Sequence, residues 1–215
     1  MLGKPPTIWY WSGAYGGLIG VNLPQPFDNE AVFTWMRINA MNGQTKDALS
    51  KSQGGNWKYD IISDGLKINM PDICAALALA QLNRYDDHLL VERKRIVNRY
   101  LSRLNQYDWF QSMPFETEDR CSSYHIFPLR IKGITEEQRD AIIANITEKR
   151  IAVNVNFMPL PMLTLFRNMG FDMADYPLAY DNYSREITLP VYPQLTNDEV
   201  DMVLAAVEEA VGEFV

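Results

Sequence analysis

The sequence of 215 residues is poor in cysteine and histidine, with two of each. Cys74 and Cys121 lie in unrelated contexts, which excludes a disulfide scaffold and favours two reduced thiols in a cytoplasmic protein. Neither His88 nor His125 has a partner at the spacing of a metal site or a catalytic triad. We therefore predict no metal site and no histidine-based catalytic group.

Basic clusters and long apolar runs are also missing. The chain has 27 acidic and 20 basic side chains, a formal charge of −7, whereas nucleic-acid binding requires lysine and arginine gathered on one face. The longest apolar stretches, such as residues 73 to 82, are about half of the roughly 20 residues that span a bilayer. We therefore predict neither a nucleic-acid partner nor a membrane span.

What is present is a globular composition, with 47% hydrophobic residues and a repeating pattern of helices and strands. Apolar spacing of three and four predicts helices at residues 29–41 and 71–82, at 89–104, and after Thr135 and Thr196. Short apolar or alternating stretches predict strands at 18–22, 124–131, 151–155 and 186–189. From about residue 105 onward this order indicates a small α/β domain.

Local signals refine some of these elements. Thr135 with Gln138, and Thr196 with Glu199, match the capping box that begins a helix. Pro128 lies inside a predicted strand, which indicates an edge strand or a bulge, because proline cannot donate to a sheet. Residues 1 to 17 combine two prolines, an aromatic run and glycines without a clear period, and residues 42 to 59 are polar and loop-like.

Two long motifs carry a resemblance. Residues 65–82, GLKINMPDICAALALAQL, resemble the GYKYNMTDI-x-AA-x-x-x-x-QL signature of the DegT/StrS family of sugar aminotransferases. Residues 184–207, SREITLPVYPQLTNDEVDMVLAAV, are similar to the closing pattern of that family, sLPlyP followed by an acidic helix. Gly16-Gly17 and the loop at 43–48 also fit, so the resemblance covers roughly residues 8 to 211.

The resemblance implies a pyridoxal-phosphate (PLP) enzyme of the aspartate-aminotransferase fold. Such enzymes transfer an amino group, usually from glutamate, to the keto group of a nucleotide-linked sugar in surface-polysaccharide or amino-sugar biosynthesis. Family members are nearly twice this length. The implied fold class is α/β, a C-terminal small α/β domain of fold type I with a remnant of the large domain. The implied parts are a large-domain remnant at 1–60, connecting helices at 61–106 and the small domain at 107–215.

The departure from the family lies at the cofactor lysine. The family pattern K-N-x-T-T-x-E-G-G, aligned on Gly16-Gly17, puts Trp9 at the position of the Schiff-base lysine and Tyr15 at that of the glutamate. The nearest lysine, Lys4, lies five residues too early. A tryptophan cannot form an imine, so no catalytic residue is predicted in this chain and PLP is not expected to bind covalently.

Five other positions match the family residue by residue. The resemblance implies that Lys67 and Asn69 reach the cofactor phosphate of a neighbouring subunit, although a loop base and a helix cap would also explain them. Phe157, Tyr183 and Arg185 match positions near the substrate cleft, and packing and surface roles are the alternative. Two family histidines are replaced, by asparagine at positions 42 and 156.

Three hypotheses follow, and they leave open whether the chain is an enzyme. In the first, it is a truncated relative that is not catalytic on its own. In the second, it is one half of a split aminotransferase, completed by a complementary large-domain chain. In the third, residues 1 to 17 are a frameshifted or rebuilt junction. The resemblance also implies a nucleotide-sugar ligand and self-association, for which Ile73 to Leu82 is the candidate surface.

Overall fold

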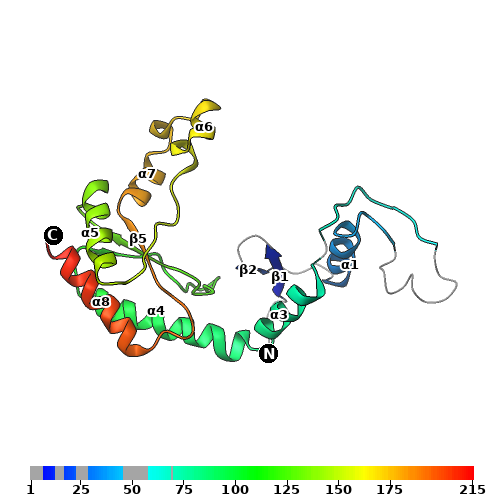
Figure 1. Ribbon diagram of the computed structural model, residues 1–215, viewed down its shortest axis with the longest axis horizontal. Coiled ribbons are helices and arrows are strands. Elements are labelled where there is room, and N and C mark those ends of the chain that lie inside the picture. The colour runs from blue at the N-terminus through cyan, green and yellow to red at the C-terminus, as the bar shows by residue number, and fades with distance from the viewer. Residues whose placement is uncertain (1–6, 13–16, 23–28, 46–57, 69) are drawn as a thin grey trace. The chain divides into compact units, whose positions relative to one another are not determined.

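The structure is a computed structural model that describes residues 7–12, 17–22, 29–45, 58–68 and 70–215. The chain divides into two compact units, Met1–Leu82 and Asn83–Val215, and Figure 1 shows the elements of each. The boundary falls inside the predicted connecting segment 61–106, and the three-part division stays a prediction. No helix in the described ranges is long and apolar enough to cross a membrane.

The first unit contains an antiparallel hairpin of β1 (Thr7–Ser12) and β2 (Gly17–Asn22), in which Thr7 pairs with Asn22 and Ser12 with Gly17. The strand predicted at 18–22 is confirmed as β2. The preceding aromatic run, for which no element was predicted, forms β1 because aromatic residues favour the extended backbone and β2 supplies a hydrogen-bonding edge. The sequence of β1 shows no alternation of apolar and polar residues, so the strand is recognised only from its pairing with β2.

Two helices complete the described part of this unit. Helix α1 (Asn29–Asn39) confirms the helix predicted at 29–41, and α3 (Asp72–Leu82) confirms the one predicted at 71–82. Asp72 lies in the first turn of α3, where its carboxylate complements the helix dipole. None of the side chains of α3 is buried, although most of them are apolar.

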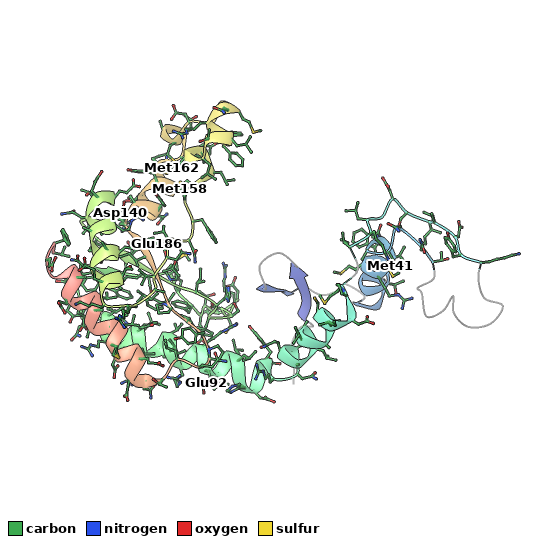
Figure 2. All side chains as sticks on the ribbon, in the orientation of Figure 1. Met41, Glu92, Asp140, Met158, Met162 and Glu186 are labelled. Carbon is green, nitrogen blue, oxygen red and sulfur yellow. The ribbon has the colours of Figure 1, made fainter. Side chains whose placement is uncertain are left out.

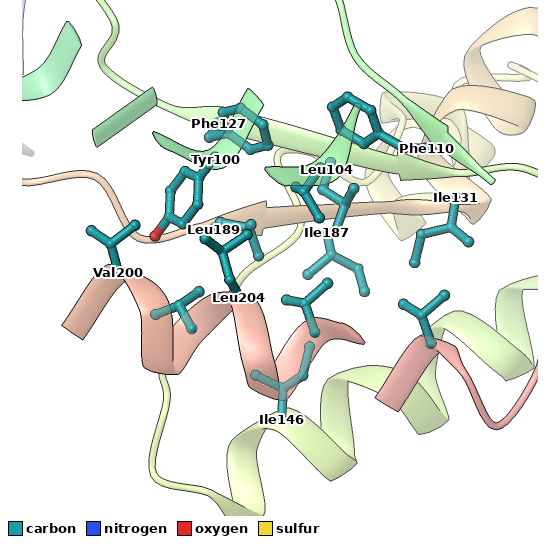
Figure 3. Close-up of a cluster of buried hydrophobic side chains, with 14 of the residues drawn as sticks. Tyr100, Leu104, Phe110, Phe127, Ile131, Ile146, Ile187, Leu189, Val200 and Leu204 are labelled. Carbon is teal, nitrogen blue, oxygen red and sulfur yellow. The ribbon is translucent and has the colours of Figure 1, made fainter. Parts of the chain in front are cut away.

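The second unit is an antiparallel sheet with helices on one face. Its elements run in the following order: η1 (Tyr85–Leu89), α4 (Leu90–Leu104), β3 (Phe110–Gln111), β4 (Phe127–Ile131), α5 (Glu136–Glu148), η2 (Leu160–Met162), α6 (Thr164–Asn168), η3 (Met173–Asp175), α7 (Pro177–Ser184), β5 (Glu186–Leu189) and α8 (Asn197–Val211). The sheet order is β3-β4-β5. Helices α4, α5 and α8 pack on one face of the sheet, and their side chains meet those of the strands in Figure 3.

The core of this unit follows from strand alternation. Phe127, Leu129 and Ile131 of β4 and Ile187 and Leu189 of β5 are fully or almost fully buried. An aromatic group lies at one end of the core, where the Phe127 ring lies 5.0 Å from Tyr100, 6.3 Å from Phe110 and 5.6 Å from Phe115, between centroids. The predicted helix starts are also confirmed, since both capping boxes form as expected at α5 and α8.

Pro128 does not mark an edge strand or a bulge, so that prediction was wrong: β4 is the central strand. Pro128 pairs with Thr188, whose N–H and C=O both bond to Asn154 on the opposite side. The backbone position of Pro128 that would carry an N–H therefore faces away from β5. On that side β3 has already ended, because its last residue, Gln111, pairs with Arg130. Proline loses no ladder bond here.

The strand predicted at 151–155 is reduced to a single bridge. Asn154 and Thr188 exchange two backbone hydrogen bonds, at 3.2 and 2.7 Å, and the neighbouring residues form no further ladder. The Asn154 side chain accepts a hydrogen bond from the backbone N–H of Val155 at 2.8 Å, a local turn that competes with extension of the strand. The chain then leaves the sheet for the excursion that carries η2, α6, η3 and α7 (Figure 1).

Candidate functional site

Residues 66–68, which we call the Lys67 loop, lie beside the end of α1. Three backbone hydrogen bonds join them: Leu66 N–H to the carbonyl of Asn39 at 2.8 Å, Ile68 N–H to that of Ala40 at 3.0 Å, and Asn42 N–H to that of Leu66 at 3.1 Å. Lys67 itself pairs with Met41 across an isolated bridge. These bonds fix the backbone of the loop although its residues are far from α1 in sequence.

Two glycines allow this close approach. Gly43 has a φ of 70°, in the left-handed region, and a Cβ there would lie 1.9 Å from the carbonyl oxygen of Ser63. A Cβ on Gly65 would lie 2.3 Å from the backbone nitrogen of Gly43. Both distances are shorter than any tolerated contact, so only glycine fits at either position. The two family-like motifs that contain these glycines are therefore in contact with each other.

The Lys67 side chain is exposed, which leaves its ammonium group available to an anion. The second predicted phosphate partner, Asn69, lies outside the described residues. Asn42, at one of the replaced histidine positions, has a φ of 58°. Asparagine tolerates this left-handed conformation better than most residues, so a turn role accounts for it.

Trp9 lies in the middle of β1, opposite Gly20 of β2. The Gly16-Gly17 motif used to align it borders β2, which begins at Gly17. The position that resembles the lysine site is thus part of a regular hairpin, with an indole in place of an amine. The fit of PLP as a covalently held cofactor fails at this position, because imine formation requires a primary amine.

Phe157 is the most exposed of the predicted substrate residues, with 80% of its surface accessible. It follows Asn156, the second replaced histidine position, whose backbone N–H donates to the Glu186 carboxylate at 3.0 Å. An exposed phenylalanine on a backbone held by the sheet can present an apolar surface to a ligand. Of the three predicted residues near the cleft, it is the one whose side chain is free to do so.

Tyr183 is buried, in contrast to Phe157, whose ring is exposed to solvent. The guanidinium of Arg139 lies 4.8 Å from the centre of its ring, and Arg139 also donates to the Tyr183 carbonyl oxygen at 2.6 Å. Burial raises the pKa of the Tyr183 hydroxyl above its ordinary value. Through these contacts Tyr183 packs between α7 and α5, and its predicted place near the substrate cleft stays a prediction.

The guanidinium of Arg185 is hydrogen-bonded to other side chains of the second unit. It makes two hydrogen bonds to the Asp181 carboxylate, at 3.0 and 2.5 Å, and one to the side-chain oxygen of Gln111 at 2.8 Å. The Asp181 hydrogen bond raises the pKa of Arg185, and the same bond lowers that of Asp181. A ligand carboxylate or phosphate would have to compete with Asp181 for this arginine.

Sequence reasoning missed Glu186. It begins β5 and is only 4% exposed although its side chain is a carboxylic acid, and it contacts the segment before Phe157. A signal was present, since Glu186 and Thr188 alternate with the apolar Ile187 and Leu189 and share one strand face. That alternation usually indicates a solvent-facing side, and for this reason the burial of Glu186 could not be inferred.

A polar recess in the described part of the chain lies apart from the predicted site residues. This recess of about 420 Å³ between α5 and α8 is lined by Asn145, Glu148, Lys149, Glu209, Ala210 and Glu213. Its three carboxylates disfavour a phosphate, and none of the predicted site residues lines it. Within the described residues, no three His, Cys, Asp or Glu side chains gather to hold a metal ion.

Comparison with known proteins identifies the family. The model of the DegT/DnrJ/EryC1/StrS aminotransferase family matches residues 27–208. The spore coat polysaccharide biosynthesis protein SpsC of Bacillus subtilis is 33% identical over 190 residues, which are 86% of this chain and 48% of SpsC. MJ1066 of Methanocaldococcus jannaschii, a protein of uncharacterised function, is 30% identical and is likewise covered over 48% of its length. The chain spans about half the length of these curated relatives.

Solved structures agree with this result. Spr1654 of Streptococcus pneumoniae, described as a sugar aminotransferase and solved in a PMP form, is 39% identical with a TM-score of 0.78. The match covers 91% of this chain and 49% of that one. PseC of Helicobacter pylori, at 21% identity and a TM-score of 0.69 over 83% of this chain and 46% of its own, shares the fold. The predicted fold class, a small α/β domain of fold type I with a remnant of the large domain, is confirmed. The chain belongs to the DegT/DnrJ/EryC1/StrS aminotransferase family.

Proposed function

We propose that this chain supplies the small α/β unit and the Lys67 loop of a sugar aminotransferase, and that these 215 residues are not catalytic by themselves. The reaction to which they contribute is the transfer of an amino group from glutamate to a nucleotide-linked keto sugar. Polysaccharide biosynthesis in the cytoplasm is the proposed context, supported by the likeness to SpsC.

The observation that carries the second half of the proposal is Trp9. It stands in β1 at the position that resembles the cofactor lysine, and an indole has no lone pair that can attack an aldehyde. PLP supplies an electron sink when it is bound, which also requires an acid beside its pyridine nitrogen. The resemblance supplies no candidate for that acid among these 215 residues.

Lys67 is the proposed phosphate contact. Its backbone is held by the bridge to Met41, and its exposed ammonium is free to extend toward an anion bound on another subunit. Asn69 is proposed as its partner on the basis of the resemblance alone. PLP would then be held by its phosphate without a covalent bond to this chain.

Phe157 is the proposed contact to the sugar nucleotide, because its ring is exposed on an ordered backbone. Tyr183 and Arg185 contribute by supporting the unit: the first packs on Arg139, and the second joins Gln111 of β3 to Asp181 of α7. Substitution of either is expected to change stability before it changes ligand binding.

A specific observation favours completion by a second chain, either another copy or a complementary large-domain chain. Helix α3 is apolar along most of its length and buries none of its side chains, with Ile73 78% and Leu77 63% exposed. Apolar helices of this kind are normally covered. Isolation from the native host under gentle conditions distinguishes the cases: a lone monomeric species would count against both forms of completion.

The direct test of function is an amino-transfer assay of the purified chain with PLP, glutamate and a UDP-linked 4-keto sugar. The proposal expects no glutamate-dependent product from the chain alone. Product formation in repeated turnovers, abolished when the chain is omitted, would overturn the claim that it is not catalytic by itself. Addition of candidate partner fractions from the host then tests the split-enzyme form of the proposal.

A further inference from the structure

Glu186 is a buried carboxylate on the face of the sheet opposite the helices. In β5, Ile187 and Leu189 point into the helix-covered core, so Glu186 and Thr188 lie on the other face. Only 4% of the surface of Glu186 is exposed. In Figure 2 it is labelled on β5, close to the excursion that carries Met158 and Met162.

Both oxygens of this carboxylate are occupied. One accepts the backbone N–H of Asn156 at 3.0 Å, and the other accepts the Thr188 hydroxyl at 2.5 Å. Thr188 also exchanges two backbone hydrogen bonds with Asn154. Residues 154 to 156 are therefore attached to β5 by three hydrogen bonds, one of which is accepted by the side chain of Glu186.

The charges around Glu186 do not explain its burial. Arg130 lies opposite Glu186 in β4, and Arg139 donates to the Glu186 backbone carbonyl at 3.3 Å rather than to its carboxylate. Burial raises the pKa of Glu186, and the Thr188 and Asn156 hydrogen bonds and the two arginines offset this only in part. An apolar residue would fill the site at a lower desolvation cost, so the carboxylate does something that an apolar residue cannot do.

We propose that Glu186 is a positioning residue in the second unit. Its carboxylate fixes the backbone of Asn156, and thereby the position of the neighbouring Phe157, the proposed contact to the sugar nucleotide. The role given to Phe157 rests on the proposed function, whereas the attachment of Asn156 does not. The hydroxyl of Thr188 holds the second carboxylate oxygen and so orients the first. Glu186 acts through Asn156 and needs no contact with the ligand.

The test compares amide hydrogen exchange in the full chain and three variants by NMR. Glu186→Leu keeps the size and removes the acceptors, and Glu186→Gln keeps one oxygen acceptor. Ile187→Val is the matched control, because it weakens the core from the neighbouring position without touching Asn156. The Ile131 amide, which bonds to the Arg185 carbonyl at 3.0 Å, serves as the internal reference.

In Glu186→Leu, exchange at Asn156 is expected to accelerate about tenfold or more relative to Ile131, because the Asn156 N–H loses its acceptor. Glu186→Gln is expected to stay within about threefold of the wild type, and Ile187→Val to accelerate both amides equally. Equal acceleration of Asn156 and Ile131 in Glu186→Leu, or no acceleration at all, would overturn the proposal.

A calorimetric titration with UDP-N-acetylglucosamine adds the functional readout. Glu186→Leu is expected to weaken binding about tenfold through misplacement of Phe157, while Ile187→Val leaves the affinity unchanged. Unchanged affinity in Glu186→Leu would overturn the positioning role for the ligand. Absence of binding by the wild type would instead count against the proposed function, and the exchange result would still decide whether Glu186 holds Asn156.

Discussion

Helices α3 and α8 are both rich in apolar residues, but they differ in how many of their side chains are buried. Helix α8 buries Val200, Val203, Leu204, Ala206, Val207, Ala210 and Val211, whereas α3, which is richer in apolar residues, buries none. The buried residues of α8 recur at the helical period and leave its acidic residues outside. In α3, small apolar residues surround the axis on all sides.

Hydrophobic content alone therefore does not place a helix in a core, because the apolar residues must also form one stripe that faces a partner surface. The stripe of α8 meets the sheet on one side, and its polar flank is paired to α4, where Arg99 makes two bonds to Asp201 at 2.7 and 2.5 Å. Within its own unit, the described residues supply no such partner for the apolar surface of α3. The second unit therefore has the features of a self-sufficient fold, and the exposed apolar surface of α3 is the reason why an interface is proposed there.

The largest expected effect comes from Phe127→Ala in the aromatic end of the core. We expect a loss of about 3–5 kcal/mol in unfolding free energy, because the fully buried ring contacts three other rings. Leu79→Ala in α3 is the matched control and should cost less than about 0.5 kcal/mol. Urea denaturation of both variants measures this. A large loss from Leu79→Ala that does not depend on protein concentration would contradict the contrast, whereas a loss that grows with concentration would support the proposed covering of α3 by a second chain.

Arg139→Met tests the polar side of the second unit. Arg139 is 1% exposed and donates to the carbonyl oxygens of Tyr183 and Glu186. Removal leaves buried acceptors unpaired, so we expect a loss of about 2–3 kcal/mol by urea denaturation. An unchanged midpoint would show that these carbonyls are hydrated, and that the unit is less tightly packed than its burial implies.

Thr196→Ala tests how much the capping box at the start of α8 contributes to stability. The Thr196 hydroxyl accepts the N–H of Glu199, whose side chain accepts the N–H of Thr196 in return. Loss of this capping box should cost about 1 kcal/mol, and Thr135→Ala in α5 should cost a similar amount. Thermal unfolding with the two variants measured together provides the check. A cost below experimental error at both sites would mean that packing alone sets these helix ends.

A smaller effect is expected in the pH dependence that Glu186 gives to the stability of this unit. Its pKa is raised by burial above the ordinary 4.5, so the folded state binds the proton more tightly than the unfolded state. The stability associated with this group is fully present below about pH 4.5 and is lost as pH rises through the raised folded pKa. Glu186→Gln should therefore gain stability relative to wild type at neutral pH, with the gain shrinking toward pH 4.5. A gain that instead grows as pH falls would contradict the sign.

Asp181 provides the opposite case in the same unit. Its pKa is lowered by the hydrogen bond to Arg185, so the associated stability is present above the ordinary value of 3.8 and is lost as pH falls through the lower folded pKa. Because Asp181 is largely exposed, we expect only a small effect. Asp181→Asn should flatten the acid limb of the stability curve of this unit.

The sequence predicted those parts of the fold that depend on local signals. The capping boxes at Thr135 and Thr196 and the strand at 186–189 needed only neighbouring residues, and they are confirmed. The errors involve pairing at a distance: Pro128 is tolerated in a central strand only because β3 ends at Gln111. Residues 151–155 have strand-like composition but find only one partner, at Thr188.

The candidate site divides in the same way. Lys67 was predicted because it lies inside a long motif, and Phe157 because its position matches the family near the substrate cleft. The structure leaves both side chains exposed. Glu186 was missed because nothing in its local sequence says that Asn156, thirty residues earlier, lies against it. Contacts of this range follow from the topology of the chain and could not be read from periodicity.

The most direct test of the central claim is borohydride trapping with PLP, followed by peptide mass spectrometry. We expect no stoichiometric adduct on any lysine of this chain and no imine absorption band near the visible edge. Trp9→Lys, which restores an amine at the matched position, is the informative variant, and Trp9→Phe is its control. A stoichiometric adduct on one lysine of the wild-type chain would contradict the claim that the chain lacks the catalytic nucleophile.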